Sequence, residues 1–221
     1  MAVFNWPATL VPRDINIMAP NETSASGASV TNFQQFYPVI RPPFQVELAF
    51  PTLTTEAQVL AYRAFIARFK GRANKVLLPL FDAYTAAPDA IRVPHSDGST
   101  FSDGAYYLQD DIEGVEVAGT QGDASIDVDF GETGLTIKAG QYFGIDYHAY
   151  IATAVYIEGT VHTIEFSASL HKSYTEGRFR LKPYIVAGLA EDQGGAHPLS
   201  YGKWTAPKVN LIERFGDEYF S

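Results

Sequence analysis

The alternation of apolar and polar residues between Phe44 and Asp82 predicts a strand, a helix and a second strand. Residues 44–50 alternate with a period of two, as in a strand with one buried face. Pro51 ends this run because proline has no backbone donor for a strand ladder. Residues 75–82 form a second, strongly apolar strand. We expect the rest of the chain to be β-structure attached to this unit.

The helix is predicted over residues 55–70. Thr54 or Thr55 supplies an N-cap oxygen, and Gln58, three residues after Thr55, is placed to complete a capping box with it. The helical spacing of the apolar residues places Leu60, Phe65 and Phe69 on the buried face. Gly71 is expected to end the helix because glycine enters the left-handed conformation without strain. The buried face can pack only against the sheet that the flanking strands form.

The later part of the chain predicts further strands. The clearest hairpin joins residues 147–157 to residues 160–166 through the turn Glu158-Gly159. A further turn is expected at residues 175–177, a surface loop over 187–202 and a final strand over 209–215. With one helix among about ten strands, the predicted fold class is mainly β with one α-helix.

Acidic residues are concentrated between residues 93 and 137, where ten Asp and Glu occur without any Lys or Arg. Several of them alternate with apolar residues, as in Val115-Glu116-Val117 and Ile126-Asp127-Val128-Asp129. Alternation of this kind places the acids on the solvated face of short strands. This concentration of acids is the sharpest charge asymmetry in the chain.

Composition excludes several classes of protein. A chain of 221 residues forms one large domain or two small ones, and its net charge of −9 argues against a basic nucleic-acid surface. The absence of cysteine excludes disulfides, thiol catalysis and cysteine metal sites. No apolar run reaches the roughly 20 residues of a membrane span, and the first residues do not resemble a signal peptide. We therefore expect a protein made and kept in the cytoplasm, without membrane contact.

No pattern in the sequence predicts a catalytic, cofactor or metal site. His148 and His162 are placed to face each other across the hairpin, where they could hold a metal ion. No closely spaced histidine pair accompanies them, so the favoured interpretation is that both side chains lie on the surface or pack between strands. The run from Asp127 to Gly131 is similar to part of a calcium loop but lacks its later acidic ligands. Phosphate-binding loops and serine nucleophile elbows are absent from the sequence. The expectation is a protein that is not an enzyme and holds no cofactor.

The chain resembles the minor tail proteins of long-tailed bacteriophages, especially the distal tail proteins that cap the tail tube. In the first ninety residues the resemblance rests on the Trp6-Pro7 strand, the small-residue loop at 24–27 and the helix that ends in the sequence 69–75 before Leu77-Leu78-Pro79-Leu80. In the second half it rests on residues 139–145, 149–151, 158–166 and 170–177.

The resemblance implies a tail-tube-like β-sandwich or barrel, flanked by the helix, in residues 1–92. Six copies would form a ring around the DNA channel, joining the tail tube to tail-tip or hub proteins. Residues 93–175 would form an acidic peripheral β-domain, and residues 176–221 the C-terminal strands, with a return to the first domain as an open alternative. DNA would pass through the lumen without specific binding. The protein would be part of the virion, assembled in the host cytoplasm.

The resemblance also assigns one candidate interaction site, an inter-subunit loop. Its residues are small or polar and are expected to become ordered on assembly. They are Ser24, Ala25, Ser26 and Gly27.

Two other functions remain open on the sequence. One is a carbohydrate-binding β-sandwich for attachment to a host surface, in which exposed tyrosines act as stacking platforms; the candidates are Tyr142, Tyr147, Tyr150 and Tyr156. The other is a hydrolase that uses a pair of carboxylates; the candidates are Asp110, Asp111, Asp127 and Asp129.

Overall fold

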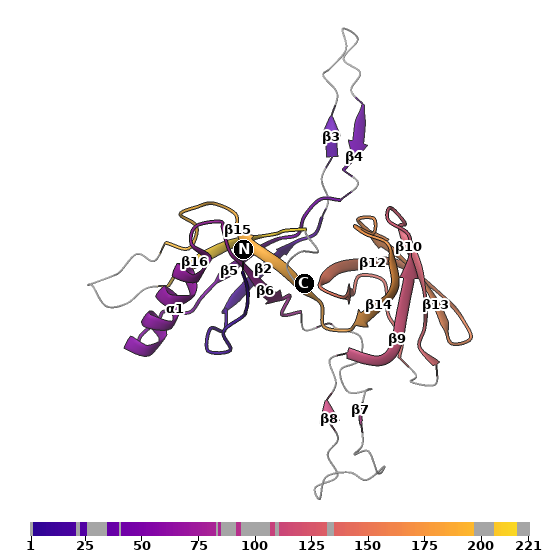
Figure 1. Ribbon diagram of the computed structural model, residues 1–221, viewed down its shortest axis with the longest axis horizontal. Helices are drawn as coiled ribbons and strands as arrows, with labels where there is room; N and C mark the ends of the chain where they lie inside the picture. Colours follow the sequence, from indigo (N-terminus) through magenta and orange to yellow (C-terminus); the bar gives the residue numbers. More distant parts are fainter. Residues whose placement is uncertain are drawn as a thin grey trace, which may run out of the picture. The chain divides into compact units, whose positions relative to one another are not determined.

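The computed structural model describes residues 2–20, 23–25, 35–39, 41–82, 84, 92–93, 107–108, 111–131, 135–196 and 206–215. These residues form sixteen strands and one helix, so the predicted mainly β fold with one α-helix is confirmed (Figure 1). The chain divides into unit 1, Met1–Leu80 with Ile185–Ser221, and unit 2, Phe81–Tyr184. The resemblance implies different boundaries, near residues 92 and 175. Unit 2 is therefore an insertion between two segments that build unit 1.

Unit 1 contains a six-stranded sheet with the order β1-β6-β15-β16-β5-β2. Its strands are β1 (Val3–Asn5), β2 (Asp14–Met18), β5 (Gln45–Ala49), β6 (Lys75–Pro79), β15 (Tyr184–Leu189) and β16 (Lys208–Glu213). β1 runs parallel to β6, whereas β15 with β16, β16 with β5 and β5 with β2 are antiparallel. The last two strands that the structure describes thus occupy the middle of the sheet, between strands formed by the first eighty residues.

The helix α1 (Glu56–Phe69) begins and ends much as the sequence predicts. The side chain of Thr55 accepts a hydrogen bond from the backbone of Gln58, and the predicted capping box is confirmed. Lys70 follows as the C-cap with a left-handed φ of 49°, and Gly71 is also left-handed with a φ of 69°. The chain therefore needs two left-handed residues, one of them a lysine, to leave the helix.

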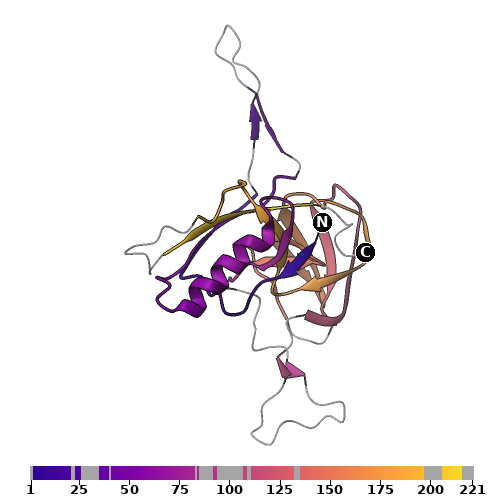
Figure 2. The ribbon, with the colours of Figure 1, turned by 60° about the vertical axis from the view of Figure 1, so that its left-hand side comes forward.

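The buried face of α1 differs from the predicted one. Phe65 and Phe69 are buried as expected, together with Val59 and Tyr62, but Leu60 is 52% exposed. The helix turns toward the sheet the side that contacts aromatic rings of the sheet and of the segments beside it. Phe65 and Phe69 contact Phe4, Phe65 also contacts Trp6, and Tyr62 contacts Phe50. Figure 2 shows α1 in front of the strands that it covers.

Tyr62 fixes the helix to the C-terminal segment of unit 1. Its hydroxyl donates to the backbone oxygen of Gly195 at 2.9 Å, and burial raises the pKa of this hydroxyl. Gly195 has a φ of 86°, and a Cβ there would lie 2.5 Å from Ile66 Cδ1. A side chain at position 195 would therefore displace the turn that receives the tyrosine.

Unit 2 contains a second six-stranded sheet, with the order β10-β13-β12-β11-β14-β9. Its strands are β9 (Asp111–Gly119), β10 (Ser125–Asp129), β11 (Tyr142–Ile145), β12 (His148–Glu158), β13 (Val161–Ser167) and β14 (Tyr174–Arg180). The two end strands, β9 and β10, are joined by a tight turn and contact each other. The sheet therefore curls into a nearly closed barrel around one apolar core.

Two local predictions in this part of the chain are wrong. Residues 175–177 lie inside β14, at an irregularity in its pairing with β9, and do not form a turn. Gly177 is required there for packing, since a Cβ would lie 2.8 Å from both Ile145 Cγ2 and Tyr174 Cδ1. Residues 187–189, predicted as the start of a surface loop, belong to the buried strand β15.

Two short strand pairs stand apart from these sheets. β3 (Thr23–Ala25) pairs with β4 (Phe36–Pro38), and β7 (Arg92–Val93) pairs with β8 (Tyr107–Leu108). Figure 1 shows β3 and β4 side by side, outside the main sheet of unit 1. No helix in the described part of the chain has the length and apolar character that crossing a bilayer requires.

Candidate functional site

The sheet of unit 1 is open at both edges. Within the described residues, β1 pairs only with β6, and β2 pairs only with β5. The side chains of Ile15 and Ile17 on β2 are half-buried, and Met18 at its end is 44% exposed. An unpaired edge strand presents backbone donors and acceptors to any further strand. On each of the two end strands, one side therefore has backbone groups that could pair with a strand of another polypeptide.

The candidate inter-subunit loop is divided by the structure. Ser24 and Ala25 lie in β3, where they pair with Tyr37 and Phe36, whereas Ser26 and Gly27 lie outside the described residues. β3 follows β2 closely along the chain, and β4 precedes β5, with which β2 pairs. The β3–β4 pair is thus a continuation of the β2–β5 hairpin beyond the main sheet; we call it the arm.

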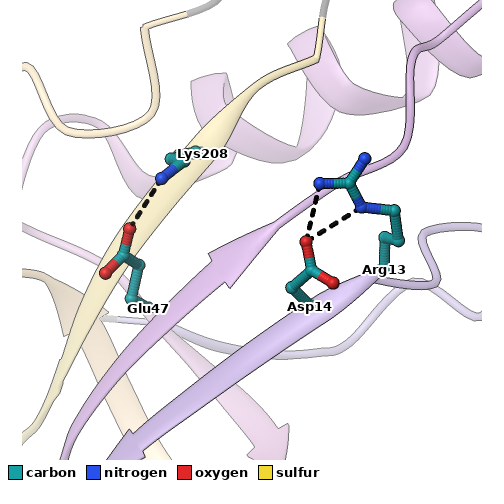
Figure 3. Close-up of polar contacts among 4 residues, drawn as sticks. All are labelled: Arg13, Asp14, Glu47 and Lys208. Atoms are coloured by element: carbon teal, nitrogen blue, oxygen red, sulfur yellow. Dashed lines mark hydrogen bonds and ion pairs between the residues drawn. The ribbon is translucent and has the colours of Figure 1, made fainter.

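The face of the sheet opposite α1 carries mostly polar side chains. Lys208 of β16 donates to Glu47 of β5 at 3.2 Å, and Arg13 pairs with Asp14 at 2.7 Å beside the edge strand (Figure 3). Both pairs are largely exposed, so each contributes at most about 1 kcal/mol to folding. We call this surface, opposite the helix, the helix-free face.

A buried carboxyl group lies on the other side of the same sheet, among apolar side chains. Glu213, at the end of β16, is 4% exposed, and its Oε2 accepts a hydrogen bond from the backbone nitrogen of Phe44 at 3.1 Å. The backbone nitrogen of Glu213 in turn donates to the oxygen of Phe44 at 2.8 Å. Burial raises the pKa of Glu213 to about 8, against the lowering effect of the Phe44 hydrogen bond. The carboxyl group therefore stays protonated well above its ordinary range.

In unit 2, one outward face of the barrel gathers acidic side chains. The strand registers align Asp127 with Thr163 and Tyr156, and Asp129 with Val161 and Glu158. The hydroxyl of Thr163 donates a hydrogen bond to Asp127 at 2.6 Å, and the backbone nitrogen of Gly131 donates one to Asp129 at 2.9 Å. The bond from Gly131 and a second bond from the side chain of Thr160 lower the pKa of Asp129. Since Asp127 and Asp129 are exposed surface acids, this geometry does not resemble a catalytic carboxylate pair. Asp110 lies outside the described residues, and Asp111 begins β9.

The four candidate tyrosines occupy different environments. Tyr150 is buried, Tyr142 and Tyr147 are half-buried, and Tyr156 is 60% exposed. Tyr147 lies under the guanidinium of Arg180, whose Cζ is 5.3 Å from the ring centre. Only Tyr156 among these four offers a largely open ring face to a ligand.

The histidines do not form the pair considered from the sequence. His148 lies against His171, with ring centres 3.4 Å apart, and His162 packs edge-on against Phe130. His171 Nδ1 is within hydrogen-bonding distance of the hydroxyls of Tyr150, at 3.2 Å, and Tyr174, at 3.0 Å. Burial lowers the pKa of His162. Among the residues that the structure describes, no group of three or more His, Asp or Glu could hold a metal ion.

Sequence reasoning missed Glu213 and His171. Glu213 continues the alternation of Val209 and Leu211, which are both buried, and this period predicts a buried side chain at position 213. No local pattern predicts the contact between His171 and His148, because it depends on the packing of separate segments.

No model of a known protein family matches the chain, and no curated protein matches it either.

Proposed function

We propose that the protein is a structural component of a bacteriophage tail, a distal tail protein that forms a six-fold ring. The observation that carries the proposal is the open sheet of unit 1, with β1 and β2 unpaired on their outer sides among the described residues. Pairing of β1 in one copy with β2 in the next would continue the sheet from subunit to subunit. A repeated head-to-tail contact closes into a ring when the rotation between subunits allows it.

The net charge supports a ring through which DNA passes. At −9, the chain as a whole repels phosphates, so DNA would move through the lumen without being held. The arm supports a further contact, in which β3 and β4 reach a neighbouring ring of tail-tube or tail-tip protein. In this role the protein is not an enzyme and needs no cofactor, and it acts in the virion after assembly in the host cytoplasm.

The ring is tested by light scattering and negative-stain imaging of the purified protein, with two matched double variants. Asn5 on β1 and Asn16 on β2 are both exposed. Asn5→Lys with Asn16→Lys would bring like charges together across the joined edges, whereas Asn5→Lys with Asn16→Glu would bring opposite charges together. We expect six-fold rings for the wild type and the Lys/Glu variant, and smaller species for the Lys/Lys variant. A wild-type monomer or closed dimer at every concentration would contradict the proposal.

Carbohydrate binding is a second candidate, favoured by the position of Tyr156. Its exposed ring is aligned across the sheet with Thr163 and Asp127, so an aromatic platform lies beside hydrogen-bonding groups that suit sugar hydroxyls. An oligosaccharide array should then show binding that Tyr156→Ala abolishes and Tyr84→Ala retains; Tyr84 is an 81% exposed tyrosine of the same unit. Equal signals for both variants would exclude Tyr156 as the platform.

A further inference from the structure

The outward side of strands β10, β13 and β12 in unit 2 is arranged in rows around the exposed ring of Tyr156. The strand registers place Tyr156 in one row with Thr163 and Asp127. Side chains that point to the same side of a sheet are two residues apart along each strand. The neighbouring rows on this side are therefore Ser125, Glu165 and Ala154, and Asp129, Val161 and Glu158. We call the surface formed by these three rows the Tyr156 face.

The Tyr156 face carries carboxylates and no cationic side chain. Its acids are Asp127, Asp129, Glu158 and Glu165, all exposed. The sequences of β10, β12 and β13 contain neither lysine nor arginine. In the part of the chain that the structure describes, none of these four acids takes part in an ion pair. Carboxylates that no cation balances give the surface around them a negative potential.

The ring of Tyr156 is open on the side away from β13. β11 is aligned only with residues 148–151 of β12, whereas Tyr156 lies further along, where β12 pairs with β13. On its own strand its nearest neighbours on the same face are Ala154 and Glu158, each about 7 Å away along the strand. A small side chain thus borders the ring at one end and a carboxylate borders it at the other.

This combination decides which ligand charge the Tyr156 face can accept. The face of a tyrosine ring offers apolar contact area and also attracts cations. A carboxylate that accepts a hydrogen bond from an ammonium group forms a bond about twice as strong as one between neutral groups. A ligand that carries its own carboxylate or phosphate would be repelled by all four acids.

We propose that the ligand of the Tyr156 face is a saccharide with free amino groups. The sugar ring would stack on Tyr156, and its ammonium groups would pair with Glu158 and Glu165, which lie on either side of the Tyr156 row. The proposal rests on the carbohydrate-binding candidate described above and names the class of sugar. It does not depend on ring formation, because the Tyr156 face lies within one chain.

The test is a titration at low salt, followed by NMR of the Tyr156 ring signals, with three oligosaccharides of equal length. They are built from glucosamine, N-acetylglucosamine or galacturonic acid. At about pH 5.5 the carboxylates are ionised and the amines of glucosamine are protonated. We expect the glucosamine oligomer to bind about tenfold more tightly than the N-acetylated one, with a difference that narrows as salt is added. The galacturonic acid oligomer should give no saturable shift.

The variants separate the contribution of charge from that of the ring. Glu158→Gln with Glu165→Gln should weaken glucosamine binding about tenfold, because glutamine cannot form the charged pairs. Glu176→Gln is the matched control, since Glu176 is an exposed glutamate on β14 of the same unit, and it should leave the affinity unchanged. Tyr156→Ala should abolish binding, as measured from the signals of the neighbouring Thr163.

The outcomes distinguish this proposal from the carbohydrate-binding candidate itself. If no oligosaccharide gives a saturable shift in the wild type, both are excluded. If the N-acetylated oligomer binds as tightly as the glucosamine oligomer, and Tyr156→Ala abolishes both, carbohydrate binding stands and the preference for amino sugars is overturned. If Tyr156→Ala retains glucosamine binding, the acids attract any cation, a basic peptide included, and the proposal is likewise overturned.

Discussion

The two units use the same number of strands and deal with their sheet edges in different ways. In unit 1 the end strands β1 and β2 remain apart, whereas in unit 2 the end strands β9 and β10 contact each other. A tight turn that joins β9 to β10 along the chain brings them together. The sheet of unit 2 therefore nearly closes on itself, whereas the end strands β1 and β2 of unit 1 each have one unpaired side among the described residues.

Each unit buries more than one titratable group, and two of them, an acid in unit 1 and a base in unit 2, make a direct comparison. Unit 1 buries the acid Glu213, whose pKa burial raises, and unit 2 buries the base His162, whose pKa burial lowers. In both cases burial disfavours the charged form, but the charged form of an acid appears at high pH and that of a base at low pH. The two units should consequently respond to pH in opposite directions.

The largest effect is expected from Phe65→Ala in unit 1. Phe65 is 2% exposed and packs against Phe4, Trp6 and Phe69, so its removal should lower the free energy of unfolding by about 3–5 kcal/mol. Trp6, whose ring contacts Phe65, lies in unit 1, so the change in its fluorescence follows the unfolding of this unit.

Leu60→Ala is the matched control for that helix, since Leu60 is 52% exposed. The melting temperature of Leu60→Ala should be close to that of the wild type. Hydrogen exchange of the β12 and β13 amides should show unit 2 unchanged in both variants. If both units of Phe65→Ala unfolded in a single transition, the two units would not be independent in stability. That result would contradict the separate treatment of their stabilities.

The next effect concerns Glu213→Gln and its dependence on pH. The unfolded carboxyl ionises near pH 4.5, whereas the folded one stays protonated up to about pH 8. Between these values the folded state binds more protons, so the stability of unit 1 should fall by a few kcal/mol as the pH rises and level off above pH 8. Glutamine does not titrate, so this dependence should disappear from tryptophan-monitored denaturation. A variant with an unchanged pH profile would exclude Glu213 as its source, and Glu47→Gln, at a half-buried carboxylate that pairs with Lys208, serves as the control.

Thr55→Ala should have a smaller effect, confined to unit 1. It removes the N-cap oxygen that accepts from Gln58 at 3.3 Å, and loss of such a cap costs about 1 kcal/mol. Thr54→Ala is the control because only the backbone nitrogen of Thr54 takes part in the capping contacts. Urea denaturation should separate the two variants; equal midpoints would show that the capping box contributes nothing to stability.

The smallest effect is expected from His162→Gln in unit 2. Protonation of the buried imidazole is disfavoured, so the folded state binds fewer protons below the ordinary histidine range near pH 6.5. Unit 2 should lose stability as the pH falls through this range, and the variant should lose less. Hydrogen exchange of β12 and β13 amides at pH 5 and pH 7 measures the difference. If the variant lost more stability than the wild type between pH 7 and pH 5, the prediction that His162 destabilises unit 2 at low pH would be wrong.

The sequence predicts those features that depend on neighbouring residues. The Thr55 capping box, the helix after it and the hairpin of β12 and β13 follow from local spacing and turn chemistry, and the structure contains all three. The exposure of Leu60 and the strand around Gly177 depend on which distant side chains pack against them, which local spacing does not specify. The candidate loop is predicted from residue size alone, and only Ser24 and Ala25 of its four residues are described.

The place of β15 and β16 in the middle of the unit 1 sheet has a consequence for synthesis on the ribosome. Without residues 184–213 the sheet would fall into two pieces, β1 with β6 and β5 with β2. Unit 2 is continuous from Phe81 to Tyr184 and can fold as soon as it has emerged. Unit 1 must wait for its central strands, so its sheet can form as one piece only after residues 184–213 have been made.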